Sequence, residues 1–94
     1  MSLTELINTL LAKKDSCNSK RKKIAFIKLG LNTVWWVLEN FTVDLTIEYL
    51  QCIQVIDPKH KEEHFNSVGN LLKKLLEKVS VSEKEGYGIS TNMH

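Results

Sequence analysis

Two histidines provide the most specific chemical pattern in the sequence, because His60 and His64 enclose Glu63 in the order His-x-x-Glu-His. In some zinc peptidases, this order places both imidazoles on one helical face as metal ligands and supplies the glutamate as general base. A zinc peptidase also needs a further ligand and a substrate cleft, which a chain of 94 residues scarcely provides. We therefore interpret both histidines as surface residues of a polar helix start. A zinc-dependent hydrolase is kept only as a third hypothesis.

The remaining reactive residue types form no catalytic pattern. Cys17 and Cys52 belong to no metal-ligand spacing or redox motif, and we interpret both as free thiols in a reducing compartment. None of the four glycines opens a helix after a strand, so a nucleotide-binding loop is not indicated. No arrangement of serine, histidine and acid can be inferred from spacing. The sequence therefore predicts a protein that is not an enzyme and that has no metal site and no cofactor.

Positive charge is concentrated in one short part of the chain, which we call the basic cluster. Its members are Lys13, Lys14, Lys20, Arg21, Lys22 and Lys23. Cations at the start of a helix oppose the helix dipole, and this mismatch is a hint of function. If the flanking helices pair, the cluster forms one patch that can contact nucleic-acid phosphates, an acidic protein or an anionic membrane surface, or act as a nuclear localisation signal. A solvated helix end that binds nothing is the simpler alternative.

The cluster does not indicate sequence-specific recognition of nucleic acid. No aromatic residue is interleaved with the cations, and no compact second helix with a turn glycine follows them. The charge is also unevenly divided, because residues 1–41 carry seven Lys and Arg against three Asp and Glu, whereas residues 42–94 carry six against eight. A nonspecific phosphate contact is the most that this pattern supports.

Trp35 and Trp36 are adjacent within Ile24–Leu38, the most apolar stretch of the chain. On a helix, adjacent side chains point about 100° apart, so we expect one of the two to face the core. The other either anchors a partner, since tryptophan is enriched at interface hot spots, or is buried as well by surrounding helices. We favour burial of both. Together with Leu72 and Leu76, the two tryptophans form the candidate partner-binding set.

Apolar spacing predicts four helices that position these residues, at 2–13, 20–39, 43–56 and 58–79. A strand is an alternative for 43–56, where Thr, Val and Ile are frequent. Because Ile24–Leu38 is apolar almost all round, we expect the second helix to be the buried, central one. The fold class predicted is all-α, a small four-helix bundle. Short loops favour an up-and-down arrangement, and the Asp57-Pro58 corner keeps an orthogonal one open.

The helix ends are predicted from capping residues. Ser2 and Glu5 form a capping box at the first helix, and Ser19 is a candidate N-cap for the second. Asn40 is expected to end the second helix in a left-handed conformation, with Thr42 or Asp44 capping the third. Asp57 and Pro58 are expected to open the fourth helix.

The chain length fits one helical domain at 1–79, followed by a flexible C-terminal tail at 80–94 that loses the helical period and gains glycine and serine. The start of the chain lacks the features of a secretory leader. The apolar run at Ile24 is interrupted by polar residues and is shorter than the roughly 20 residues that cross a bilayer. We therefore expect a cytoplasmic protein without a membrane span, or a nuclear one if its source is eukaryotic.

Two hypotheses of different classes follow for the function. The first is a protein-protein interaction or regulatory module, in which an apolar helical face docks a partner helix or a second copy as a homodimer. It depends on the excess of apolar helical surface in so small a chain. The second is a small nucleic-acid-associated protein that uses the basic cluster, and it depends on charge placement alone.

Overall fold

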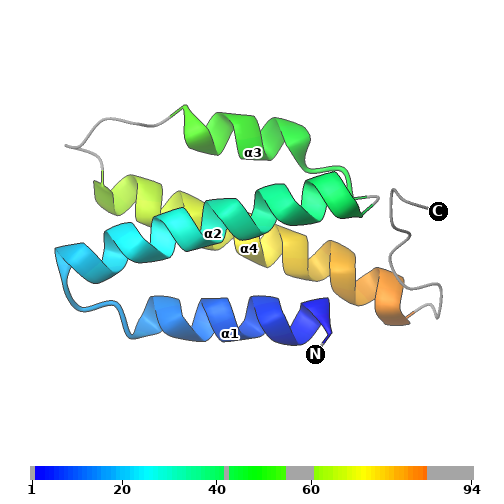
Figure 1. The fold of residues 1–94 in the computed structure, drawn as a ribbon, viewed down its shortest axis with the longest axis horizontal. Helices are drawn as coiled ribbons and strands as arrows, with labels where there is room; N and C mark the ends of the chain where they lie inside the picture. Colours follow the sequence, from blue (N-terminus) through cyan, green and yellow to red (C-terminus); the bar gives the residue numbers. More distant parts are fainter. Residues whose placement is uncertain (1, 42, 55–60, 85–94) are drawn as a thin grey trace.

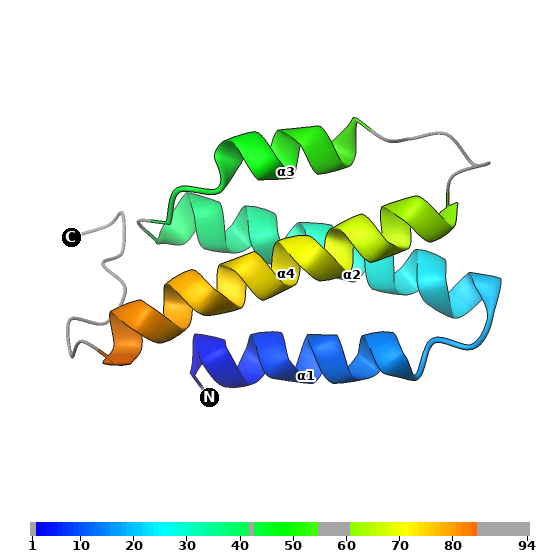
Figure 2. The ribbon, with the colours of Figure 1, turned by 180° about the vertical axis from the view of Figure 1, so that it is seen from behind.

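The computed structural model describes residues 2–41, 43–54 and 61–84, and this part of the chain forms four helices and no strand. The helices are α1 (Leu3–Asp15), α2 (Lys20–Asn40), α3 (Thr46–Ile53) and α4 (Lys61–Lys84). Figures 1 and 2 show that consecutive helices run in opposite directions, as in an up-and-down bundle. The predicted all-α four-helix bundle is confirmed. None of the helices, as far as they are described, has the length and hydropathy needed to cross a lipid bilayer.

The first two helices begin at the serines that the sequence indicated. Ser2 Oγ accepts a hydrogen bond from the backbone N–H of Glu5 at 3.1 Å, and Ser19 Oγ accepts one from Lys22 at 3.2 Å. Each serine is extended while the next residue is helical, so its hydroxyl satisfies a backbone donor that has no partner within the helix. The N-caps of α1 and α2 are therefore confirmed.

The end of α2 differs from the prediction. Asn40 remains helical, and its side-chain amide donates to the carbonyl of Trp36 at 2.8 Å. The left-handed conformation expected for Asn40 is therefore wrong. Phe41 takes the C-cap position instead, with an extended backbone at φ −131° and an N–H that donates to the Val37 carbonyl. The chain thus leaves the helix without needing a residue in the left-handed region.

Helix α3 starts later than the predicted 43–56 and is only eight residues long as described. Its N-cap position is held by Leu45, which makes no side-chain capping bond, so Asp44 is not the cap. Thr42, the other candidate, lies outside the described residues. Leu45 is buried in the core. Packing of this apolar side chain, rather than capping, determines where α3 begins, and the segment is a helix and not the alternative strand.

Helix α4 buries an apolar stripe against the other three helices. Its buried apolar side chains are those of Phe65, Val68, Leu71, Leu72, Leu75 and Val79. The helix continues to Lys84, five residues past its predicted end, so the expected change from domain to tail at residue 80 falls inside α4. Asp57 and Pro58, its predicted first residues, lie outside the described part. The division into a domain and a tail stays a prediction.

The core is organised around the pair of α2 and α4. These two helices pack on each other, α1 and α3 lie on opposite sides of the pair, and α1 does not contact α3 within the described residues. Helix α4 supplies more buried side chains than any other helix. The prediction that the helix containing Ile24–Leu38 is buried all round is wrong, because the side of α2 that faces away from α4 has no helix over it.

Candidate functional site

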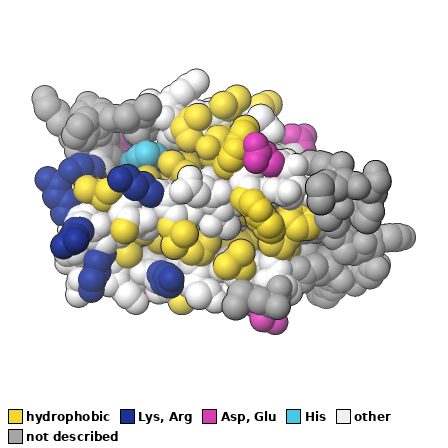
Figure 3. Space-filling model, viewed as in Figure 1, with side chains coloured by type: hydrophobic (Ala, Val, Ile, Leu, Met, Phe, Trp, Pro, Cys, Tyr) yellow, Lys and Arg dark blue, Asp and Glu magenta, His cyan; other side chains and the backbone are white. Residues whose placement is uncertain are grey.

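Five large apolar side chains are exposed on α2 and α3. They are Leu29 (43%), Trp35 (45%), Trp36 (48%), Ile47 (68%) and Leu50 (46%). Figure 3 shows hydrophobic atoms over α3 and along α2 on the side of the molecule where α2 lies in front of α4. We call the surface formed by Leu29, Trp35, Trp36 and Leu50 the outer face. Several large apolar side chains exposed on one side of a molecule mark a site of interaction more often than a single exposed residue does.

Both tryptophans are partly exposed, which corrects the expectation that both are buried. The Trp35 ring lies 5.5 Å from the ring of Tyr49 in α3, with 30° between the planes. The Trp36 ring meets Phe41 edge to face at 5.4 Å. Each indole is therefore held against one aromatic neighbour while about half of it remains exposed. The physical reason is that α1 and α3 flank α2 without meeting above it.

The two leucines of the candidate partner-binding set lie elsewhere. Leu72 is completely buried, and Leu76 is partly buried against the same core. Leu72 therefore cannot contact a partner while the bundle is intact, and its place in the candidate set is a correction. Both leucines are on α4, the helix that packs against the other three, so their stripe is used within the chain.

The seam between α1 and α2 adds two hollows to the outer face. One, of ≈ 300 Å³, is lined by Leu6, Asn32, Thr33 and Trp36. The other, of ≈ 330 Å³, is lined by Lys13, Ser16, Cys17, Lys22, Ala25, Phe26 and Leu29. The sequence singled out neither Leu6 nor Leu29 as a surface residue, because each belongs to an apolar stripe that looks like core until the neighbouring helix is placed.

The basic cluster is gathered at one end of the bundle, where α1 ends and α2 begins (Figure 3). Two of its members also serve the fold. Lys14 Nζ lies 4.9 Å above the ring of Phe65 in α4, and Lys23 Nζ lies 5.5 Å from the same ring. Lys23 also forms an ion pair with Glu62. The predicted proximity of the cations is therefore observed, although Lys14 and Lys23 are partly engaged.

A seventh cation joins this end, and the sequence did not indicate it. Lys61, the first residue of α4, lines a pocket together with Lys20 and Lys23. Contact with the Lys20 side chain lowers the pKa of Lys61. The two lysines are far apart in the sequence. They meet because α3 runs back along α2, so that α4 starts beside the start of α2 and runs parallel to it (Figure 1).

Of the two histidines in the His-x-x-Glu-His pattern, the structure describes only His64. His60 lies outside the described residues, and Nε2 of the partly buried His64 has no hydrogen-bond partner. No group of three metal-ligating side chains occurs within 2–41, 43–54 and 61–84. The described residues therefore form no zinc-binding arrangement.

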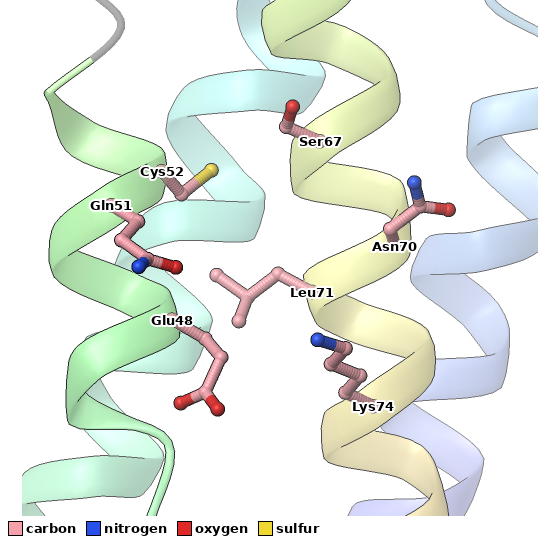
Figure 4. A pocket seen from close by; sticks show the side chains of 7 residues that line it. All are labelled: Glu48, Gln51, Cys52, Ser67, Asn70, Leu71 and Lys74. Carbon is pink, nitrogen blue, oxygen red and sulfur yellow. The ribbon is translucent and has the colours of Figure 1, made fainter.

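A cleft between α3 and α4 contains the second cysteine. It measures ≈ 250 Å³ and is lined by Glu48, Gln51, Cys52, Ser67, Asn70, Leu71 and Lys74 (Figure 4). Cys52 and Cys17 are both free thiols, as predicted. Burial raises the pKa of the Cys52 thiol, which favours the protonated form and weakens it as a nucleophile. The cleft as described offers no histidine to activate this thiol.

The chain matches no protein-family model, and no curated protein or solved structure is significantly similar to it.

Proposed function

We propose that this protein is a small non-enzymatic interaction module that docks a helical partner on its outer face. One observation carries the proposal, namely that Trp35 and Trp36 are each about half exposed on α2. Aromatic contacts with Tyr49 and Phe41 hold the two rings in place, so binding costs little side-chain entropy. Complete burial of a large apolar side chain contributes about 1.5–3 kcal/mol, so covering the exposed half of each indole contributes roughly half of that, which makes both rings suitable anchors.

The exposed residues of α2 form a continuous face that also contains polar groups. Beyond the basic first turn, they recur at helical spacing, at Ala25, Lys28, Leu29, Asn32, Trp35, Trp36 and Glu39. Residues at this spacing share one side of a helix. A polar ridge through Lys28 and Asn32 therefore runs between the apolar groups. Such a mixed surface is suited to a partner whose polar side chains complement the ridge.

The charges along α2 favour a second copy of the chain as that partner. The helix begins with Lys20, Arg21, Lys22 and Lys23, whereas Glu39 and Asp44 lie at its other end. In Figure 3, the basic side chains gather at one end of the face and most of the visible acidic ones lie toward the opposite end. A two-fold pairing with antiparallel α2 helices sets each basic end against an acidic end, whereas a parallel pairing opposes like charges.

Sedimentation velocity over a range of concentrations tests this proposal. We expect the wild-type protein to shift from monomer to dimer as its concentration rises, and the double variant Trp35→Ser/Trp36→Ser to remain monomeric, because the apolar anchors are lost. Lys73→Ser/Glu77→Ser, which changes two exposed residues of α4 and keeps the net charge, is the matched control and should dimerise like the wild type.

Affinity capture tests whether the outer face binds a different protein, or the basic cluster binds nucleic acid, in place of a second copy of the chain. If the wild type is monomeric at every concentration, the second copy is rejected, and capture that depends on Trp35 and Trp36 then supports a different helical protein. Equal capture by the wild type and the tryptophan variant contradicts the interaction module itself. Recovery that is lost on nuclease treatment supports the alternative of a nucleic-acid-associated protein, which the gathering of the basic cluster at one end favours.

A further inference from the structure

A separate pocket lies at the basic end of the bundle, away from the outer face. It measures ≈ 280 Å³ and is lined by Asn18, Ser19, Lys20, Lys23, Lys61 and Glu62. The first four residues belong to the α1–α2 loop and the start of α2, and the last two belong to the first turn of α4. Three ammonium groups from two helices thus surround one small space that contains a single carboxylate.

The three lysines differ in whether a negative charge is paired with them. Lys23 forms an ion pair with Glu62 and lies over the Phe65 ring, so its charge and that of the only carboxylate are matched. Lys20 and Lys61 line the same pocket, and no carboxylate pairs with either of them in the described part of the chain. Two like charges in contact destabilise each other unless an anion lies between them. The pKa of Lys61 is lowered first by the side-chain interaction with Lys20, then by desolvation and by the positive charge of Lys20.

We propose that this pocket binds a phosphate group with two negative charges, held between the ammonium groups of Lys20 and Lys61. Two unmatched cations correspond to a doubly charged phosphate or phosphate monoester rather than to a singly charged phosphodiester. Ser19 lines the same space. Its oxygen accepts from the backbone N–H of Lys22, and its hydroxyl hydrogen, which has no acceptor among the described residues, can be donated to the ligand. The pocket is larger than phosphate alone and leaves space for the group that a monoester carries.

The inference does not depend on partner docking, because no residue of the pocket belongs to the outer face. It also differs from binding to a nucleic-acid backbone, whose internal phosphates each carry one charge. Of the basic cluster, Lys20 is the member proposed to hold the phosphate, together with Lys61 of α4. Lys14 lies elsewhere, packed against Gly69 and Phe65.

Titration of the full chain with inorganic phosphate at constant ionic strength, followed by backbone amide NMR shifts, tests the proposal. We expect saturable shifts at residues 18–20 and 61–62, and about tenfold or greater weakening of binding in Lys20→Gln/Lys61→Gln, as for loss of charge-assisted hydrogen bonds. Phenyl phosphate, a monoester, should bind at least as well as inorganic phosphate if the ligand is an ester. Weaker binding of phenyl phosphate assigns the site to free phosphate.

The control variant Lys73→Gln/Lys78→Gln removes two exposed cations from the same helix and should bind phosphate like the wild type. Dimethyl phosphate, which has a single charge, should bind much more weakly than inorganic phosphate. Equal affinity for the two probes, equal weakening in the control variant, or shifts that do not saturate would each overturn the proposal. Circular dichroism establishes that each variant keeps its helices, and Lys61→Gln alone provides the test if the double variant is unfolded.

Discussion

Gly30 is the residue at which α2 comes into direct contact with α4. A Cβ atom at this position would stand 2.6 Å from Cγ1 of Val68 and 3.4 Å from Cδ1 of Leu72. Val68 is fully buried and branched at Cβ, so it has no free space into which its methyl group can turn. The missing side chain of Gly30 is therefore a requirement of the helix pair, although glycine lowers the intrinsic stability of a helix.

We predict that Gly30→Ala destabilises the fold, by about 1–3 kcal/mol for the overpacked contact less up to about 1 kcal/mol gained in helix propensity. Gly69→Ala is the matched control. Its Cβ would meet Cε and Cδ of Lys14, the far end of a flexible side chain that can move away. Urea denaturation should show a lower midpoint for Gly30→Ala and an unchanged or higher one for Gly69→Ala. Equal effects of the two substitutions would contradict this packing.

The exposed tryptophans show how far single residues could be interpreted from the sequence. The apolar character of Ile24–Leu38 was evident, and one buried and one exposed indole was among the alternatives. Exposure of both depends on whether a helix covers α2 from outside, and no feature of residues 24–38 carries that information. Leu72 and Trp36 are both large and apolar, yet one is fully buried and the other is half exposed.

At the scale of elements, α3 is the helix with the fewest stabilising interactions in the bundle. It has eight residues, no side-chain cap at its start and one buried residue, Cys52. Isolated helices of this length are not stable in water, so α3 depends on its packing against α2 and α4. By contrast, α4 has buried residues from Phe65 to Val79 and contacts every other helix.

We therefore predict that α3 opens locally at a lower free energy than α4. In hydrogen exchange followed by NMR, the amides of Leu50–Ile53 should exchange at least about tenfold faster than those of Leu71–Leu75, because only global unfolding exposes the latter. The amides of Val34–Leu38 in α2 provide a second reference within the core. Equal protection of α3 and α4 would contradict this view and indicate that all four helices unfold as one unit.

The starts of α1 and α2 were predictable because a serine and the backbone N–H three residues later are local partners. The end of α2 and the start of α3 were not. There, burial of Leu45 determines the path of the chain. Asn40 does not adopt the expected left-handed conformation, and Asp44 does not cap α3. Capping residues thus predict a helix end where no core packing is involved. They fail where the turn between two helices must place an apolar residue in the core.

At the scale of the whole molecule, the unequal charge of the two ends bears on how copies pair. If the proposed antiparallel dimer forms, raising NaCl from 0.1 M to 1 M should weaken it, because the screening length falls from about 10 Å to about 3 Å. Sedimentation equilibrium at both concentrations measures the change. The variant Trp35→Ser/Trp36→Ser should stay monomeric at both. Dimerisation that strengthens with salt would show that like charges meet and would contradict the antiparallel arrangement.

The sequence by itself determined the number of helices, most of their apolar stripes and two of their caps, since these depend on contacts within a few residues. The tertiary structure decided which helix is central, why both tryptophans are accessible and why Leu72 is not. It also brought Lys61 to Lys20, which line one pocket although forty residues of chain separate them. Each of these outcomes depends on which helices lie side by side, and that is the sum of many weak contacts between distant residues rather than a property of any one segment.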